Sequence, residues 1–175
     1  MRVLAAGVAA LALASCHRAP VPPSGPAAPT VAPAADAGVA STPTGVQTAL
    51  PFEWSLSPAA DGSLRAGPRG RSVLRIDVAP AGTQRPTPET LSEGFEAGLK
   101  GLSATVIRTD QDANFSGVVL AVSHAQAGTV ASHPVFLGAK ASGTVLYLCA
   151  STPGSSLTEL SRAAALCRDL APAHR

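Results

Sequence analysis

A long stretch rich in proline and alanine limits where this chain can build a hydrophobic core. Residues 18–47 read RAPVPPSGPAAPTVAPAADAGVASTPTGVQ and contain no aromatic side chain. Each proline fixes its φ angle and removes a backbone donor, and the segment has too little bulky apolar surface to offset the entropy of ordering it. We therefore expect residues 16–47 to form a disordered tether, and a single folded domain to span residues 48–175.

An apolar run precedes the tether. Residues 3–14, VLAAGVAALALA, follow one positive charge at Arg2. As a helix this run rises about 18 Å, which is less than the roughly 30 Å of hydrocarbon in a bilayer. Its length and flanks are typical of the core of a secretory signal peptide, so we predict a signal peptide over residues 1–15.

The run ends in Leu13-Ala14-Ser15-Cys16, which resembles the lipobox of bacterial lipoproteins. The resemblance implies that Cys16 receives a diacylglyceryl group, becomes the first mature residue and anchors the chain to a membrane of the cell envelope. Two or more acyl chains hold a protein stably at a bilayer. In Gram-negative members of this class, histidine rather than aspartate at residue 17 favours the periplasmic face of the outer membrane. The alternative is an ordinary secretory signal with a free Cys16.

The charge pattern argues against a nucleic-acid partner. The formal net charge is +2, and the part after residue 47 is almost neutral. Such a surface lacks the basic footprint that binding to a phosphate backbone requires. Four arginines lie between residues 65 and 75, and we interpret them as solvated side chains of a turn and a strand edge.

The pattern of apolar residues predicts the elements of the folded part. Residues 50–57 and 72–79 alternate apolar with polar side chains, which predicts a hairpin of two half-buried strands across the turn-rich residues 60–71. Four further strands are predicted over 104–109, 115–124, 133–140 and 144–150. The middle strands are apolar on both faces, which indicates that both faces are covered. The short connections between them favour antiparallel neighbours.

Two helices are predicted around these strands. Residues 87–102 form the first, with Thr87 as N-cap and Pro88 at the first helical position. Gly94 and Gly98 lie within it and either allow another segment to approach closely or have no structural role. The second helix spans residues 157–170 and begins with a capping box of Ser156 and Glu159.

Together these elements predict an α+β fold in which an antiparallel sheet of about six strands carries two packed helices. The order of two strands, a helix, four strands and a helix resembles the PsbP-like α/β sandwich. That family contains mostly accessory, assembly and binding proteins. The resemblance therefore implies a binding role, and it transfers no catalytic residues.

Two cysteines remain besides Cys16. Cys149 ends the last predicted strand, and Cys167 lies on the apolar stripe of the last helix. A strand that returns as a helix brings the two together, and the exported compartment is oxidising, so we predict a disulfide between them. Redox-active pairs are usually closer in sequence, which favours a structural disulfide. Two buried thiols are the alternative.

The sequence contains no complete catalytic or metal-binding motif. Residues 110–114, DQDAN, begin like a calcium loop but lack its later glycine and glutamate, so we interpret them as a turn. His124 and His133 flank a predicted turn, but two histidines do not complete a zinc site. There is no G-x-S-x-G motif and no phosphate-binding loop. We therefore expect no catalytic residues, no metal and no cofactor.

These observations lead to one functional hypothesis and two alternatives. We expect an envelope lipoprotein that acts as a non-enzymatic binding, adaptor or assembly module for another envelope protein. The first alternative is a hydrolase whose site is assembled from the distant residues His124, His133 and Asp112. The second is a structural subunit of an envelope complex, which would expose a large apolar patch.

Overall fold

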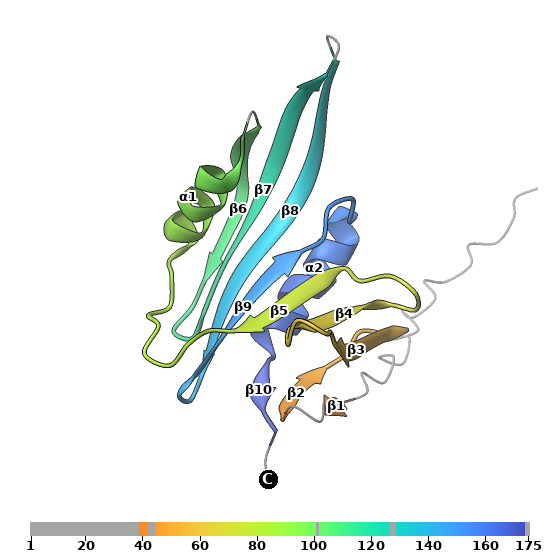
Figure 1. Cartoon of the computed structure of the whole chain (residues 1–175), viewed down its shortest axis with the longest axis vertical. Coiled ribbons are helices and arrows are strands. Elements are labelled where there is room, and N and C mark those ends of the chain that lie inside the picture. The colour runs from red at the N-terminus through yellow and green to blue at the C-terminus, as the bar shows by residue number, and fades with distance from the viewer. Residues whose placement is uncertain (1–38, 42–44, 101, 127–128, 174–175) are drawn as a thin grey trace, which may run out of the picture. The chain divides into compact units, whose positions relative to one another are not determined.

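The computed structural model describes residues 39–41, 45–100, 102–126 and 129–173. They form a seven-stranded antiparallel sheet, a three-stranded antiparallel sheet and two helices (Figure 1). The predicted α+β fold, with helices packed on an antiparallel sheet, is confirmed. The predicted signal peptide, Cys16 and most of the predicted tether lie outside the described residues.

The large sheet has the strand order β3-β4-β5-β9-β8-β7-β6, and the small sheet has the order β1-β2-β10. The large sheet consists of β3 (Trp54–Pro58), β4 (Leu64–Pro68), β5 (Leu74–Val78), β6 (Ser103–Gln111), β7 (Phe115–Gln126), β8 (Thr129–Ser142) and β9 (Val145–Ser151). The small sheet consists of β1 (Val39–Ser41), β2 (Val46–Ala49) and β10 (Ala171–Pro172). The helices are α1 (Pro88–Gly98) and α2 (Leu157–Arg168).

The large sheet has one strand more than the six predicted. The turn-rich residues 60–71 contain β4, which pairs with both β3 and β5, so the predicted direct hairpin of residues 50–57 with 72–79 is wrong. Leu64 and Ala66 of β4 are buried, whereas Arg65 between them is not. Gly62 and Gly70 adopt positive φ angles at the turns on either side. The glycines that suggested one long turn therefore form two tight turns around a short strand.

The folded part begins before the predicted boundary at residue 48. β2 starts at Val46, which is buried, and β1 precedes it. β2 pairs with β1 on one side and with β10, the strand after α2, on the other. Strands this short have no clear sequence pattern of their own, and their pairing depends on bringing the C-terminal end of the chain next to β2.

Helix α1 begins where the sequence predicts. Thr87 is the N-cap, and its hydroxyl accepts a 3.3 Å hydrogen bond from the backbone N–H of Thr90. Pro88 occupies the first helical position, where its missing N–H has no cost. The helix ends at Gly98 rather than at residue 102, because Leu99 has an extended backbone.

Helix α2 begins with the predicted capping box. The Ser156 hydroxyl accepts a 3.3 Å hydrogen bond from the backbone N–H of Glu159, and the Glu159 carboxylate accepts a 2.8 Å hydrogen bond from the backbone N–H of Ser156. These two bonds satisfy donors that the first turn of a helix leaves free. The helix ends at Arg168, rather than at residue 170, with Asp169 as the C-cap.

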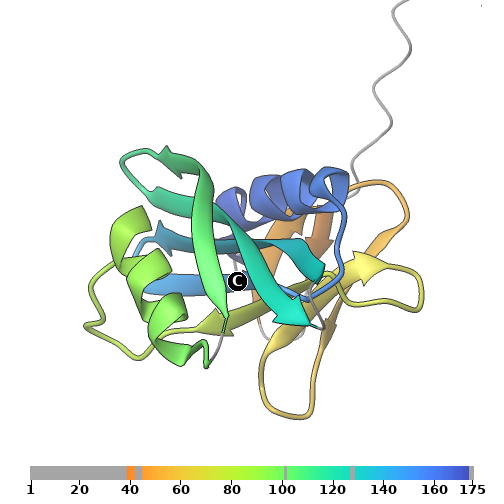
Figure 2. The same ribbon diagram turned by 90° about the horizontal axis from the view of Figure 1, so that it is seen from above.

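The two helices cover opposite faces of the large sheet (Figure 2). On one face, α2 packs on a core that includes Phe115, Phe136 and Tyr147, to which Val46 of the small sheet also belongs. On the other face, Leu91 and Phe95 of α1 and Leu99 just after it pack against Val118, Leu120, Val122, Val135 and Leu137. Successive strand residues point to opposite faces, so β7 and β8 have both of their apolar faces covered, as predicted.

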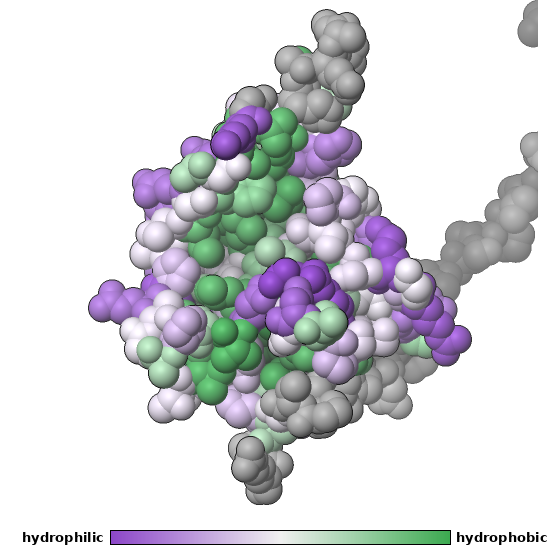
Figure 3. Space-filling view, viewed as in Figure 1, coloured by the Kyte–Doolittle hydropathy of each residue, from purple (hydrophilic) through white to green (hydrophobic). Residues whose placement is uncertain are grey.

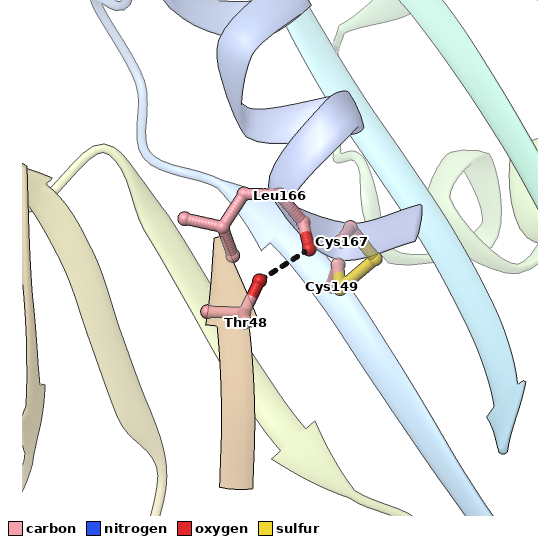
Figure 4. The surroundings of a disulfide bond; sticks show 4 residues. All are labelled: Thr48, Cys149, Leu166 and Cys167. Atoms are coloured by element: carbon pink, nitrogen blue, oxygen red, sulfur yellow. Dashed lines mark hydrogen bonds between the residues drawn. A yellow bond between two sulfur atoms is a disulfide. The ribbon is translucent and has the colours of Figure 1, made fainter. Parts of the chain in front are cut away.

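The predicted disulfide between Cys149 and Cys167 is present and joins β9 to α2 (Figure 4). The two Cα atoms are 6.4 Å apart, and both residues are buried. Close to it, the hydroxyl of Thr48 in β2 donates a 3.2 Å hydrogen bond to the carbonyl of Leu166 in α2. The end of α2 is therefore fixed to the large sheet covalently and to the small sheet by a buried hydrogen bond.

Two glycines make room for aromatic rings beneath α2. Gly117 of β7 lies directly opposite Gly138 of β8. A Cβ atom at Gly117 would lie 2.9 Å from the ring of Phe115, and one at Gly138 would lie 2.6 Å from the ring of Phe136 and 3.3 Å from the Cys167 sulfur. The repeated Phe-x-Gly pattern of β7 and β8 thus stacks the two rings over backbone that has no side chain.

Candidate functional site

The three residues of the hydrolase alternative are not assembled into one site. Asp112 lies in the turn between β6 and β7, whereas His124 pairs with Ala131 near the far end of β7. The part of β7 from Phe115 to His124 alone spans about 30 Å at roughly 3.3 Å per residue. His133 is exposed on β8 and lies opposite Val122, two residues away from His124 in register. The structure therefore brings the two histidines onto neighbouring strands and leaves Asp112 far from them.

Asp112 shapes the turn at residues 112–114, so the predicted turn over 110–114 is confirmed there, whereas Asp110 and Gln111 belong to β6. Its Oδ1 accepts hydrogen bonds of 2.8 Å from the backbone N–H groups of Asn114 and Phe115. The hydrogen bond from Asn114 is the largest cause that lowers the pKa of Asp112, and the guanidinium of Arg168 lowers it further.

Arg168, the last residue of α2, ties this turn to the helix. Its Nη2 lies 2.5 Å from Oδ2 of Asp110, and its Nε lies 3.5 Å from Oδ2 of Asp112. The guanidinium also stacks 4.6 Å from the centre of the Phe115 ring. These contacts assign Asp110 and Asp112 a structural role at the junction of β6, β7 and α2.

Arg65, Arg71 and Arg75 pair with carboxylates, and the partner of Arg71 is Glu159 of α2. Arg75 donates to both carboxylate oxygens of Asp77, at 2.7 and 2.8 Å, and lies 3.1 Å from Asp61. Arg65 lies 3.2 Å from Asp61, whose pKa is lowered mainly by the hydrogen bonds from Ser63. These carboxylates balance much of the positive charge, in agreement with solvated side chains rather than a basic binding surface.

No metal or membrane-spanning site is found in the part of the chain that the structure describes. Within residues 39–41, 45–100, 102–126 and 129–173, no group of three or more His, Cys, Asp or Glu side chains is arranged to hold a metal ion. Neither helix of these ranges has the length and hydrophobicity needed to cross a bilayer.

An apolar groove of about 290 Å³ lies between α1 and the large sheet. It exists because α1 rests on β6, β7 and β8 and leaves the same face of β9 and β5 uncovered. Figure 3 shows hydrophobic side chains gathered on this face, next to a hydrophilic group. The helix contributes Thr90, Leu91, Gly94 and Phe95, and the sheet contributes Asp77, Leu137, Gly138, Leu148, Cys149 and Ala150.

The two walls of the groove differ in chemistry. On the sheet side, Asp77 stands at the groove with its charge balanced by Arg75. On the helix side, a Cβ atom at Gly94 would meet no atom within 4 Å, and the same holds at Gly98. Of the two alternatives for these glycines, a close approach of another segment is not found among the described residues. An apolar surface with a few polar groups at its rim is suited to binding apolar groups.

The sequence contained only an indirect signal for this groove. Leu148 and Ala150 of β9 are apolar residues on the face of α1, but covered faces were predicted only for the strands over 115–124 and 133–140. Helix α1 has eleven residues and lies over neighbouring strands instead. The groove could not be predicted, because its walls meet only through the placement of α1 on the sheet.

The sequence matches no protein-family model and no curated protein. A crystal structure of a protein from Bacteroides thetaiotaomicron is similar to this chain with a TM-score of 0.38 and 12% sequence identity. The match covers 75% of this chain and 46% of that protein, so this chain spans less than half of its length. A likeness of this size assigns neither a family nor a function.

Proposed function

We propose that this protein is a membrane-anchored envelope lipoprotein whose folded part acts as a non-enzymatic binding, adaptor or assembly module for another envelope protein. The observation that carries the proposal is the apolar groove between α1 and the face of β8 and β9. It combines exposed apolar walls with a rigid base, since β9 is joined to α2 by the Cys149–Cys167 disulfide.

The anchor part of the proposal is supported by the residues Leu13-Ala14-Ser15-Cys16 and by the composition of the segment that follows. A disordered proline-rich tether of the kind predicted from the sequence would extend by up to about 3.1 Å per residue. The folded part would thus meet partners well away from the lipid surface, on the periplasmic face of the outer membrane.

Replacing Cys16 tests the anchor. We expect Cys16→Ala to move the protein from the membrane fraction to soluble or unprocessed fractions, and Ser24→Thr, which lies outside the four-residue motif, to serve as a control for expression. Unchanged processing and unchanged membrane attachment of Cys16→Ala would show that the anchor is assigned wrongly.

The occupant of the groove is proposed to be an apolar segment of the partner protein. Each square ångström of apolar surface removed from water contributes about 25 cal/mol, so a few aliphatic side chains supply a useful part of the binding free energy. The ordering of both partners offsets part of that gain. We therefore expect specific but reversible binding, as an adaptor requires.

A side chain added at Gly94 tests the groove without disturbing the core. Gly94→Leu places four carbon atoms at the helix wall, where nothing lies within 4 Å, whereas Gly98→Leu adds the same atoms outside the groove. In-cell cross-linking with the parent chain should capture one stoichiometric envelope protein. Capture should be lost in Gly94→Leu and kept in Gly98→Leu. Equal capture by both variants would exclude the groove as the binding surface.

A further inference from the structure

Strand β6 forms one end of the large sheet, and no other strand of the described residues pairs with its outer edge. It pairs with β7 on one side only, and most of its residues are exposed. Val106 and Ile107 keep 48% and 54% of their surface accessible, although α1 packs near this strand. An exposed edge of this kind is a template on which another strand can pair.

The backbone of β6 presents hydrogen-bonding groups to the outside at Thr109. The N–H of Asp112 donates to the carbonyl of Phe115 across the hairpin turn, which makes residues 112 and 115 a hydrogen-bonded pair. Antiparallel pairs alternate between hydrogen-bonded and non-hydrogen-bonded. Thr109, opposite Val118, therefore belongs to a non-hydrogen-bonded pair, and its N–H and C=O point away from β7.

The sequence around Thr109 is complementary to itself when it runs antiparallel. A two-fold axis at Thr109 places Arg108 of each copy opposite Asp110 of the other and pairs the two threonines. Opposite charges and Thr–Thr pairs across strands are favourable, and like charges are unfavourable. A two-fold axis at residue 108 would place the two copies of Arg108 opposite each other, and an axis at residue 110 would do the same for the two copies of Asp110. Charge therefore selects the register centred on Thr109.

The side chains of β6 that lie on the same face of the sheet as α2 favour the register centred on Thr109. Among the described residues, Arg108 has no ion-pair partner, whereas Asp110 already binds Arg168 and would receive a second cation. A bulge between Val106 and Arg108 turns Ile107 toward α2, where it lines a groove of about 210 Å³ with Leu157, which is 61% exposed. Two apolar side chains from distant elements thus lie beside the edge of β6.

We propose that a second copy of this chain binds the edge of β6, with the two β6 strands antiparallel and centred on Thr109. The product is a continuous sheet that runs through both copies and leaves neither β6 edge open. The interface is isologous, as in most symmetric dimers. It is small, so we expect a dissociation constant in the micromolar range, and confinement of two anchored chains to one membrane would raise their effective concentration. This proposal does not depend on the groove beside α1.

Cysteine cross-linking tests the register. All variants carry Cys16→Ser, so that the introduced thiol is the free one beside the Cys149–Cys167 disulfide. In the proposed dimer the two Thr109 Cα atoms are about 5.5 Å apart, within the range of a disulfide, whereas the two Gln111 Cα atoms are about 13 Å apart. Under mild oxidation, Thr109→Cys should form a covalent dimer at least tenfold faster than Gln111→Cys. Equal rates, or no dimer with Thr109→Cys, would overturn the proposal.

Charge reversal tests the complementarity by a separate measurement. Arg108→Asp places a carboxylate of each copy opposite Asp110 of the other copy. Arg69→Asp makes the same charge change at an exposed turn away from β6. Sedimentation of the Cys16→Ser chain should show a monomer–dimer equilibrium, weakened at least tenfold by Arg108→Asp and unchanged by Arg69→Asp. A parent chain that stays monomeric, or equal association of both variants, would refute pairing with a second copy.

Discussion

Replacing Gly138 by alanine should destabilise the fold more than a single methyl group usually does. The new Cβ atom would lie 2.6 Å from Cζ of Phe136 and 3.3 Å from the sulfur of Cys167. Phe136 is 1% exposed, so its ring cannot swing into solvent. The sulfur cannot retreat freely either, because it is bonded to Cys149.

The expected change in the free energy of unfolding is the sum of two opposing contributions. Overpacking a dense core costs about 1–3 kcal/mol. Replacing glycine by alanine also lowers the conformational entropy of the unfolded chain, which stabilises the folded state by about 0.4–1 kcal/mol. We therefore expect Gly138→Ala to lower the free energy of unfolding by about 1–2 kcal/mol, which corresponds to a fall in Tm of about 3–8 °C for a folded part of this size.

Urea unfolding of the Cys16→Ser chain measures this effect, with Gly94→Ala as the matched control. Gly94 lies in α1 with open space around it, so the same substitution should stabilise the helix by about 0.5–1 kcal/mol. The two variants should thus shift the midpoint in opposite directions. If Gly138→Ala were as stable as the parent, the argument that the ring and the disulfide leave no room at this position would be refuted.

Three further predictions concern the disulfide, the N-cap of α2 and the loss of thermal stability at low pH. Reducing the Cys149–Cys167 disulfide, which joins residues 18 apart in sequence, should lower the free energy of unfolding by about 3 kcal/mol; an unchanged urea midpoint with reductant would contradict a structural role. Ser156→Ala should cost about 1 kcal/mol by the same assay, and the exposed Ser161→Ala should cost much less; equal losses would argue against the capping box. Asp112 has a lowered pKa in the folded chain, so its stabilising effect is complete above its unfolded pKa of about 3.9 and is lost as the pH falls through the folded value. The Tm of Asp112→Asn should therefore fall less than that of the parent between pH 5 and pH 2, and parallel curves would refute this.

Local patterns predicted the elements that depend on neighbouring residues. Thr87 and the pair Ser156 and Glu159 marked both helix starts, because an N-cap needs only residues within one turn. The disulfide also followed from short-range order, since β9 runs directly into the connection before α2. Strand β4 was missed because its buried Leu64 and Ala66 lie between glycines that also occur in a long turn.

The candidate site likewise depends on contacts that local sequence patterns do not predict. Gly94 was noticed in the sequence, but its position at an open groove depends on how α1 crosses the sheet. Asp112, His124 and His133 were grouped because two of them flank one turn, and the register of β7 then placed Asp112 at the opposite end of the strand.

The sequence by itself determined the caps, the disulfide partners and the antiparallel pairing of neighbouring strands, because each depends on spacing along a few residues or on simple returns of the chain. The tertiary structure decided that the helices lie on opposite faces, that residues 46–49 join a second sheet with the C-terminal end, and that β6 is left at an open edge. These features arise from contacts between segments far apart in sequence, whose free energy depends on the packing of whole elements rather than on any local pattern.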